Sequence, residues 1–224
     1  MKKMKSLYKR TFADQVITIY NELSPGAEWV LNGEGDVTEK MDGTCCKIED
    51  NVLYKRYDRK LKKDVAKRNR GNKTFYPLLS DFKEPPAGWE PCEKSFDPYT
   101  FHWPGWLEVD PNLPEDKYHI DAFECCVVYG EGSSSKCSIA WEPYKDGTYE
   151  LIGPKVQGNP HNVAIHMLCV HGHRQLKDVP TSLEGLRNYF NHNVIEGVVW
   201  HHKNDGRMVK IKRSDFGYEW PMRR

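Results

Sequence analysis

The sequence lacks a long apolar run. No segment approaches the roughly 20 consecutive apolar residues that a membrane-spanning helix needs, and the basic N-terminus, MKKMKSLYKR, is not followed by the apolar stretch of a secretory signal. The 224 residues are nevertheless 38% hydrophobic, which suffices for a buried core. The length fits one large domain or two small ones. We expect an intracellular, cytoplasmic protein without a membrane partner, a monomer rather than an oligomer, and a single domain over residues 1–224.

The sequence also lacks a regular cysteine pattern. Its seven cysteines are an odd number, and two pairs of them, Cys45-Cys46 and Cys125-Cys126, are adjacent along the chain. Adjacent pairs suit neither a disulfide framework nor a C-x-x-C metal knuckle. We therefore expect reduced thiols, most of them buried as small apolar side chains.

A large net charge is missing as well, but the charges are unevenly distributed. Residues 55–73 hold ten Lys or Arg against two acids, a local charge of +8, and residues 207–224 hold six against two, a local charge of +4. Two basic blocks in a chain whose formal net charge is +1 favour a surface that binds a polyanion. On charge alone, a solvated helix face explains the first block equally well.

Strands outnumber helices in the predicted secondary structure. Nine segments rich in β-branched and aromatic residues are bounded by Gly, Pro, Asn or Asp, as strands are, and Asn204-Asp205-Gly206 between the last two is typical of a tight hairpin. The sequence therefore predicts an α+β fold with antiparallel sheets. The predicted strands are 16–20, 44–48, 52–57, 123–129, 138–141, 149–152, 164–170, 194–200 and 207–212.

Two segments are predicted to be helices. Residues 59–70 combine good helix formers with a narrow apolar side. A second helix follows Thr181 and Glu184, which have the spacing of a capping box. Between residues 81 and 114, many Pro, Gly and Trp residues indicate ordered irregular structure held by aromatic rings.

The segment TEKMDG at 38–43 is a candidate nucleophile site. If it is a strand, Lys40 and Asp42 point to the same side, because side chains alternate along a strand. A lysine amine attacks only when it is neutral, so it needs desolvation or nearby positive charge to lower its pKa. Taken alone, K-x-D-G is also compatible with a surface turn.

A second candidate is RMVKIK at 207–212. Lys210 and Lys212 fall on one face of the predicted strand, whereas Val209 and Ile211 fall on the other. Two lysines that face one cleft suit a triphosphate, and they would lower the pKa of a lysine placed opposite. An edge strand that uses Lys against aggregation is the alternative.

Two carboxylates interrupt apolar strands. Glu196 lies in IEGVVW and Glu150 lies in YELIG, and a buried carboxylate is costly without a partner. A divalent cation would satisfy Glu196, as would Lys210 or Lys212 across the hairpin, and Glu150 could accept a hydrogen bond from a ribose hydroxyl. An ordinary salt bridge explains each of them as well.

These pieces follow one another in a fixed order. K-x-D-G at 40–43 is followed by Arg56, by the strand that carries Glu150, by E-G-V-V at 196–199 and by K-x-K at 210–212. This order resembles that of the covalent nucleotidyltransferases, the superfamily of DNA ligases, RNA ligases and mRNA capping enzymes. Five matches in order are far more specific than any one of them.

A closer resemblance is to the 5′-3′ RNA ligases typified by the small vertebrate enzyme, and it extends from about residue 38 to residue 221. It rests on EKMDGTCC at 39–46, YDRK at 57–60, DFKEPPAGW at 81–89, PGW at 104–106, YELIGPKVQGNPH at 149–161, HG at 171–172, IEGVVWH at 195–201 and KIKRSDFGYEWP at 210–221.

The resemblance implies an ATP-dependent RNA ligase on a nucleotidyltransferase domain of antiparallel sheets with flanking helices and no OB-fold domain. Its cofactors would be ATP and Mg²⁺ or Mn²⁺, and its partner would be RNA with 5′-phosphate and 3′-hydroxyl ends. AMP would pass from ATP to Lys40 and then to the RNA 5′-phosphate, and would leave when the 3′-hydroxyl attacks. The basic segment 59–70 would contact RNA phosphates.

The resemblance also implies catalytic roles. Lys40 would be the nucleophile that attacks the α-phosphorus of ATP. Lys210 and Lys212 would hold the α-phosphate and promote the departure of pyrophosphate. Glu196 would be the metal-associated carboxylate at the nucleotide.

Other residues would bind the nucleotide, as the resemblance implies. Glu39 would lie near the adenine. Asp42 and Glu150 would contact or orient the ribose and the lysine, and Arg56 would bind the ribose or the incoming RNA 5′-phosphate.

The sequence departs from this pattern at the adenine. Enzymes of the superfamily usually place an aromatic ring against the base, but residues 164–171 contain neither Phe nor Tyr, so His171 or an apolar side chain would serve. Cys169, His171 and His173 could instead form a metal site, although the predicted pocket is lined by acids.

Three other functions stay open. One is an mRNA capping-type guanylyltransferase that uses GTP. Another is a non-catalytic RNA-end-binding protein, although a decayed site has no reason to keep Lys40, Glu196, Lys210 and Lys212 together. The last is an unrelated RNA-binding module in which K-x-D-G is accidental.

Overall fold

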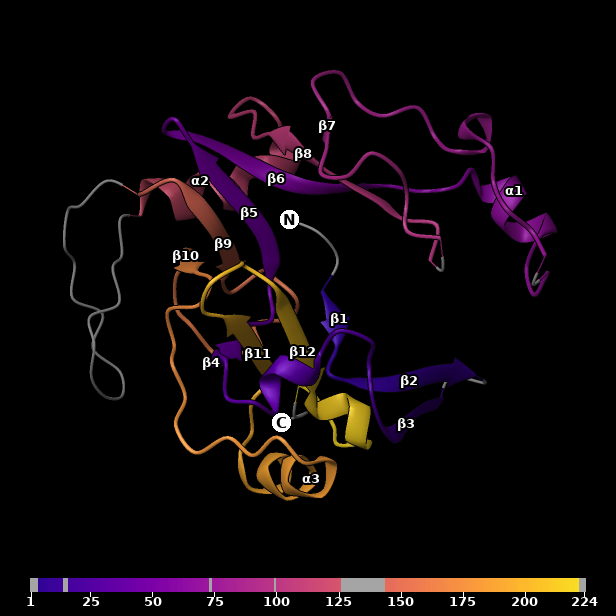
Figure 1. Cartoon of the computed structure of the whole chain (residues 1–224). Coiled ribbons are helices and arrows are strands. Elements are labelled where there is room, and N and C mark those ends of the chain that lie inside the picture. Colours follow the sequence, from indigo (N-terminus) through magenta and orange to yellow (C-terminus); the bar gives the residue numbers. More distant parts are fainter. Residues whose placement is uncertain (1–3, 14–15, 73, 99, 126–143, 222–224) are drawn as a thin grey trace. The chain divides into compact units, whose positions relative to one another are not determined.

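The computed structural model describes residues 4–13, 16–72, 74–98, 100–125 and 144–221. Within these residues the fold is mixed α and β and consists mostly of strands, as predicted (Figure 1). The chain divides into two compact units: among the described residues, unit 1 lies within residues 44–151 and unit 2 comprises residues 4–43 and 152–221. The strand predicted at 138–141 lies outside the described residues.

Unit 2 is built on a four-stranded sheet. Its order is β1 (Lys5–Ser6), β12 (Met208–Lys212), β11 (Gly197–His202) and β4 (Gly35–Lys40). β11 pairs antiparallel with both β4 and β12, whereas β1 pairs parallel with β12. The unit also contains an antiparallel hairpin of β2 (Tyr8–Ala13) and β3 (Val16–Leu23), the strand β10 (Met167–Val170), and the 3₁₀ helices η1 (Glu28–Val30) and η4 (Arg213–Phe216).

Alternation along β12 gives the sheet one buried face. Val209 and Ile211 are 4% and 0% exposed, whereas Lys210 and Lys212 are only half-buried. The prediction that the two lysines share the opposite face is confirmed. The core beneath the sheet contains Leu7, Tyr8, Ala27, Trp29, Val30, Leu186, Phe190, Val198, Trp200, Val209, Ile211 and Phe216.

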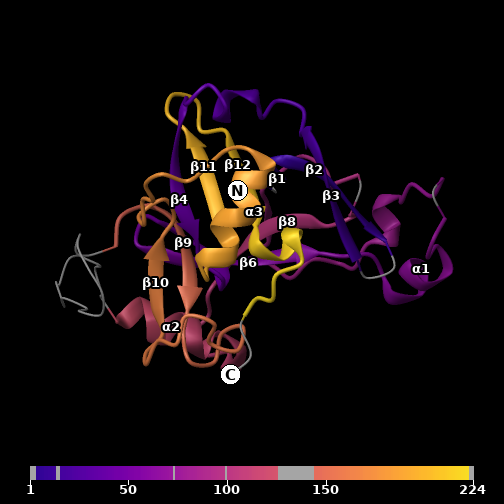
Figure 2. The ribbon, with the colours of Figure 1, turned by 90° about the horizontal axis from the view of Figure 1, so that it is seen from below.

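The helix α3 (Leu183–His192) covers this core (Figure 2). The hydroxyl of Ser182 caps it by accepting a hydrogen bond of 3.2 Å from the backbone amide of Gly185. The predicted helix is confirmed, but the predicted capping box of Thr181 and Glu184 is wrong by one residue. Ser and Thr are both good N-cap residues, so the sequence alone does not show whether the helix begins after Thr181 or after Ser182.

Several strand boundaries of unit 2 differ from the prediction. β3 runs on to Leu23, and only Met167–Val170 of the predicted strand 164–170 is extended in a sheet. The strand predicted at 194–200 begins at Gly197, so Glu196 lies immediately before it.

Unit 1 is built on an antiparallel sheet. Its order is β9 (Gly147–Ile152), β5 (Thr44–Glu49), β6 (Val52–Arg59), β8 (Trp103–Glu108) and β7 (Glu90–Pro91). The predicted strands at 44–48, 52–57 and 149–152 are confirmed. The unit also contains the 3₁₀ helices η2 (Leu79–Asp81) and η3 (Pro114–Asp116).

The helices of unit 1 differ from the prediction. α1 (Lys63–Arg68) is shorter than the predicted helix 59–70, because Arg59 belongs to β6 and Leu61 forms a β-bridge with Phe82. α2 (Lys117–Glu124) was not predicted, and it makes Phe123 helical where a strand was expected. The remainder of that predicted strand, from residue 126, lies outside the described residues. No helix in the described part of the chain has the length and apolar character needed to span a bilayer.

The region predicted to be irregular contains the strand β8. Gly105 of this strand lies against the indole of Trp89, and a Cβ at Gly105 would be 2.1 Å from Trp89 Nε1. That nitrogen donates a hydrogen bond of 3.2 Å to the carbonyl of Tyr57 on β6. Trp89 also meets Trp103 edge to face at 5.6 Å between ring centroids. The predicted support by aromatic rings is therefore confirmed, although the backbone is more regular than expected.

Candidate active site

The pairing of three strands in unit 2 places two predicted site lysines around one glycine. Gly197 of β11 lies opposite Lys40 of β4 and opposite Lys212 of β12. A Cβ at Gly197 would lie 2.4 Å from the carbonyl oxygen of Ile211, so the close approach of β12 requires glycine there. The two lysines are thus separated by two strand spacings, roughly 10 Å between backbones, and their long side chains can meet above Gly197.

The carboxylate of Glu196 is where these lysines meet. Its Oε2 accepts a hydrogen bond of 2.6 Å from Lys40 Nζ, and its Oε1 accepts one of 2.5 Å from Lys212 Nζ. Glu196 is only 3% exposed, and an isolated buried carboxylate would be costly. Two charge-assisted hydrogen bonds offset that cost. The salt bridge to a lysine across the hairpin, one of the two partners predicted for Glu196, is confirmed.

Lys210 is the third lysine of this cluster. Burial, followed by the positive charges of Lys40 and Lys212, lowers the pKa of Lys210 to about 8. Three lysines and one carboxylate leave the cluster with an excess of positive charge, which disfavours the protonated form of Lys210. The cluster is therefore suited to bind a polyanion, whose charge would compensate this excess.

The loop after Lys40 differs from the prediction. β4 ends at Lys40, so Asp42 is in a loop and the alternation of a strand does not place it beside Lys40. Asp42 is instead held by two partners within unit 2. Its backbone amide donates to His161 Nε2 at 2.9 Å, and its Oδ2 accepts from the indole of Trp220 at 2.8 Å.

His161 and Trp220 were not singled out from the sequence. Their rings also lie near one another, with 6.0 Å between centroids. Both residues lie at the ends of motifs on which the family resemblance rests. His161 is the last residue of YELIGPKVQGNPH at 149–161, and Trp220 is the next to last residue of KIKRSDFGYEWP at 210–221. That was the available signal, but spacing along the chain does not reveal a contact between residues 42, 161 and 220.

Glu39 precedes the lysine on β4. Burial raises its pKa, although Arg174 opposes this with an ion pair of 3.1 Å. The backbone amide of Glu39 donates to the carbonyl of Arg174 at 2.9 Å. A carboxyl group that binds a proton more readily than usual can serve either as hydrogen-bond donor or as acceptor toward a polar ring.

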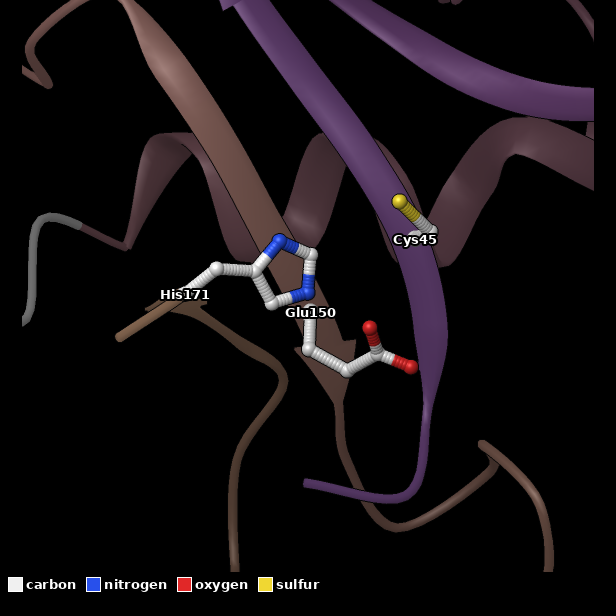
Figure 3. A group of neighbouring side chains, drawn as sticks. All are labelled: Cys45, Glu150 and His171. Atoms are coloured by element: carbon white, nitrogen blue, oxygen red, sulfur yellow. The ribbon is translucent and has the colours of Figure 1, made fainter. Parts of the chain in front are cut away.

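The remaining predicted residues, Arg56 and Glu150, belong to unit 1. Arg56 lies on β6, and its Nε forms an ion pair of 2.9 Å with Asp58. Glu150 lies on β9 directly opposite Cys45 of β5, and Figure 3 shows its carboxylate beside this strand. Burial, followed by the negative charge of Glu150, raises the pKa of Cys45 to about 12. The Cys45 thiol therefore stays protonated and unreactive, as expected of a reduced structural cysteine.

The alternative metal site near β10 is wrong. Within the described residues, Cys169, His171 and His173 do not bring their ligand atoms together as a set. Cys169 is buried at 7% exposure, whereas His173 is exposed. The neighbouring His201 shares a hydrogen bond of 2.9 Å with the hydroxyl of Thr38. Burial, followed by the proximity of His171, lowers the pKa of His201.

The donor set fits a magnesium–nucleotide complex in part. Glu196 supplies hard carboxylate oxygens, but lysines hold both of them. A single protein carboxylate is typical of Mg²⁺ sites that use phosphate oxygens and water for the other positions. Lys210 and Lys212 provide the positive charge that phosphate oxygens would meet.

Comparison with known proteins places the chain in a family. The model of the family described as RNA ligase 1 matches residues 21–224. RNA ligase 1 of Pongo abelii is 30% identical over 222 residues, covering 83% of this chain and 68% of that protein. RNA ligase 1 of Danio rerio is 28% identical over 226 residues with the same coverage, and that of Rattus norvegicus is 28% identical over 222 residues. The family match over nearly the whole chain agrees with the order of the five motifs and with the lysine cluster that three of them form. The chain therefore belongs to the RNA ligase 1 family.

Proposed function

We propose that this RNA ligase is ATP-dependent and joins RNA 5′-phosphate to 3′-hydroxyl ends through a lysyl-AMP on Lys40. The observation that carries the proposal is the cluster in which Glu196 holds Lys40 and Lys212 beside Lys210. One lysine at the end of a strand, two lysines on the adjacent hairpin and one carboxylate supply a nucleophile and a binding site for phosphates.

The charges of the cluster favour nucleophilic attack. Lys40 must be neutral when it attacks, and Glu196 lies within hydrogen-bond distance of its amine. Glu196 orients the Lys40 amine and, as a carboxylate, can accept a hydrogen bond from it. Lys210 and Lys212 would then stabilise the negative charge that accumulates on the phosphate oxygens.

The reaction would run in three displacements at phosphorus. Lys40 Nζ forms a bond to the α-phosphorus of ATP as the bond to pyrophosphate breaks. An oxygen of the RNA 5′-phosphate then attacks this phosphorus, and the P–N bond breaks, which restores Lys40. Finally the 3′-hydroxyl attacks the 5′-phosphorus of the RNA, loses its proton, and AMP leaves. Positioning and charge stabilisation would supply most of the catalysis.

The other site residues would bind the nucleotide. Mg²⁺ or Mn²⁺, when bound with ATP, would neutralise phosphate charge, with Glu196 as its protein carboxylate. Glu39 would lie near the adenine, Asp42 and Glu150 would orient the ribose and the lysine, and Arg56 would meet the ribose or the RNA 5′-phosphate. Support for Asp42 comes from its two fixed hydrogen bonds, which hold the loop next to Lys40 in one conformation.

We also propose that both units belong to one nucleotidyltransferase domain over residues 1–224. The family match, which includes residues of both units, supports this.

Intact-mass measurement after incubation with ATP and Mg²⁺ tests the proposal. We expect a gain of one AMP, about 329 Da, which is lost in Lys40→Ala and kept in Lys203→Ala, a control that removes an exposed lysine from the same unit. An adduct with GTP in place of ATP would instead indicate a capping-type guanylyltransferase. Folded protein free of bound AMP that forms no adduct with either nucleotide would leave only a non-catalytic RNA-end-binding protein.

A further inference from the structure

An exposed apolar patch lies in unit 1, and the active-site proposal does not use it. Tyr76, Leu78 and Leu79, which we call the apolar patch, are 66%, 70% and 62% exposed. Large apolar side chains are seldom this exposed within four consecutive residues without a binding role. On one side Tyr76 rests against Phe96, with 5.4 Å between ring centroids, and Phe96 is buried. Phe96 therefore contacts one side of the Tyr76 ring, and the other side is accessible to a ligand.

The backbone ties the apolar patch to the basic segment of residues 60–70. The amide of Lys62 donates to the carbonyl of Asp81 at 2.8 Å, and the amide of Lys83 donates to the carbonyl of Lys60 at 3.0 Å. The β-bridge of Leu61 with Phe82 lies between these two bonds. Leu79 is the first residue of η2, Leu78 caps it, and η2 ends at Asp81, so these backbone hydrogen bonds join the end of the apolar patch to the basic segment.

The segment next to the patch carries cations that no acid neutralises. Asp64 forms an exposed ion pair with Arg68. Within the described part of the chain, the other cations of residues 60–70 form no ion pair, and all are exposed. These cations are Lys60, Lys62, Lys63, Lys67 and Arg70.

We propose that the apolar patch is a base-stacking site for the unpaired end of the RNA substrate. The ring of Tyr76 would stack on a base, Leu78 and Leu79 would pack against its edge or its neighbour, and the cations of residues 60–70 would hold the phosphates of the same strand. This inference rests on the proposed function, because it takes RNA as the substrate.

The chemistry of the surface favours a single-stranded polyanion with flat apolar faces. A duplex buries its bases and would present only phosphates to Tyr76, which leaves the apolar patch exposed. Single-stranded nucleic acid offers both phosphates for the lysines and bases for the ring, and this combination is typical of proteins that bind single strands. A purely acidic protein surface would use the lysines but not the patch.

Binding of fluorescent RNA tests the proposal on the full chain. The probes are a single-stranded oligoribonucleotide with a 5′-hydroxyl, the same strand with abasic positions, and a blunt duplex, all without ATP. We expect Tyr76→Ala to weaken binding of the single strand by about 5-fold to 100-fold, the loss of one base–aromatic stack. Binding of the abasic strand and of the duplex should change by less than about 2-fold.

Two variants serve as controls. Tyr76→Phe keeps the ring and should bind the single strand within about 2-fold of the wild type, because stacking does not need the hydroxyl. Phe12→Ala removes an equally exposed aromatic ring, at 73%, from β2 of unit 2. The cations beside Phe12, Lys9 and Arg10, are both paired with carboxylates, so this variant should leave RNA affinity unchanged.

Three results would overturn the inference. Unchanged single-strand affinity in Tyr76→Ala would assign the apolar patch to another partner, such as a protein. Equal losses on the intact and the abasic strand would mean that the variant acts through the phosphates or the fold. A loss in Tyr76→Phe as large as in Tyr76→Ala would exclude stacking. Because the probes cannot be ligated, these results are independent of whether the wild type forms lysyl-AMP, which tests the proposed function separately.

Discussion

The indole of Trp220 donates a hydrogen bond of 2.8 Å to Oδ2 of Asp42, 178 residues earlier in the chain. The loop that follows Lys40 is therefore held by the last turn of the described chain. His161 completes this arrangement by accepting a hydrogen bond from the Asp42 amide. A residue near the end of the sequence thus takes part in positioning the candidate nucleophile.

Replacing Trp220 should slow the formation of lysyl-AMP. Trp220→Phe keeps a ring beside His161 but removes the N–H donor, and a hydrogen bond to a charged group contributes about 1.5 to 3 kcal/mol. We expect a fall in the single-turnover rate of about 10-fold, measured by intact mass over time. Tyr218→Phe in the same tail should keep the wild-type rate, and a wild-type rate in Trp220→Phe would show that Asp42 needs no support.

Removing the charge of Glu196 should destabilise the protein. Glu196→Gln keeps the shape of the side chain but leaves Lys40 and Lys212 without their carboxylate. Breaking a buried ion pair costs about 3 to 5 kcal/mol; because both lysines are partly exposed, we expect about 1 to 3 kcal/mol. Urea unfolding would show a lower midpoint with an unchanged slope.

Glu22→Gln is the matched control for that experiment. It breaks an exposed ion pair with Lys9, and exposed pairs contribute at most about 1 kcal/mol. Equal effects of the two variants would mean that Glu196 is not the electrostatic centre of the cluster.

The pKa of Lys210 predicts a change of stability with pH. Its pKa in the folded protein is about 8, below the ordinary lysine value of 10.5. Between these two values the unfolded chain binds the proton and the folded protein does not, so the free energy of unfolding rises with pH. Compared with Lys210→Met, the wild type should gain up to about 3 kcal/mol between pH 8 and pH 10.5. Urea unfolding at several pH values measures this difference, and parallel curves for the two proteins would contradict it.

The contact of Gly105 with Trp89 predicts that adding one methyl group at position 105 strongly lowers the free energy of unfolding. In Gly105→Ala the new Cβ would clash with the indole, so the ring must move and give up its hydrogen bond to Tyr57. Overpacking of this kind costs about 1 to 3 kcal/mol, to which the lost hydrogen bond adds about 1 kcal/mol. Tryptophan fluorescence during urea unfolding would report both the shift of the ring and the loss of stability.

Gly88→Ala provides the comparison for that variant. No atom lies within 4 Å of a Cβ at Gly88, and its only cost is a φ of +78°, about 1 to 2 kcal/mol. If Gly88→Ala destabilised the protein more than Gly105→Ala, the packing of Trp89 would not be what requires glycine at position 105.

The sequence predicted well those parts of the fold that depend on local patterns. β-branched and aromatic residues between turn residues located β5, β6 and β12, and alternation along β12 placed Lys210 and Lys212 on one face. The capping signal at residues 181–184 located α3 to within one residue. These patterns are reliable because each depends only on residues a few positions apart.

Features that depend on distant contacts were missed. β8 contains Pro104 and Gly105, which argue against a strand locally, but Trp89 requires the glycine and pairing on both sides keeps the chain extended. The basic run before α1 was expected to be helical, but Leu61 pairs with Phe82 instead. At the candidate site, motif order predicted the lysine cluster, while the support of Asp42 by Trp220 could be seen only in the folded chain.

The bridge that Glu196 forms between Lys40 and Lys212 has a consequence for selectivity. Glu196 competes with bound anions, because an anion that binds Lys40 and Lys212 must replace the hydrogen bonds of its carboxylate. A ligand with a single charge gains little from that exchange. A ligand with several charges on adjacent phosphates gains more attraction than it disrupts, so the cluster favours polyvalent anions over singly charged ones.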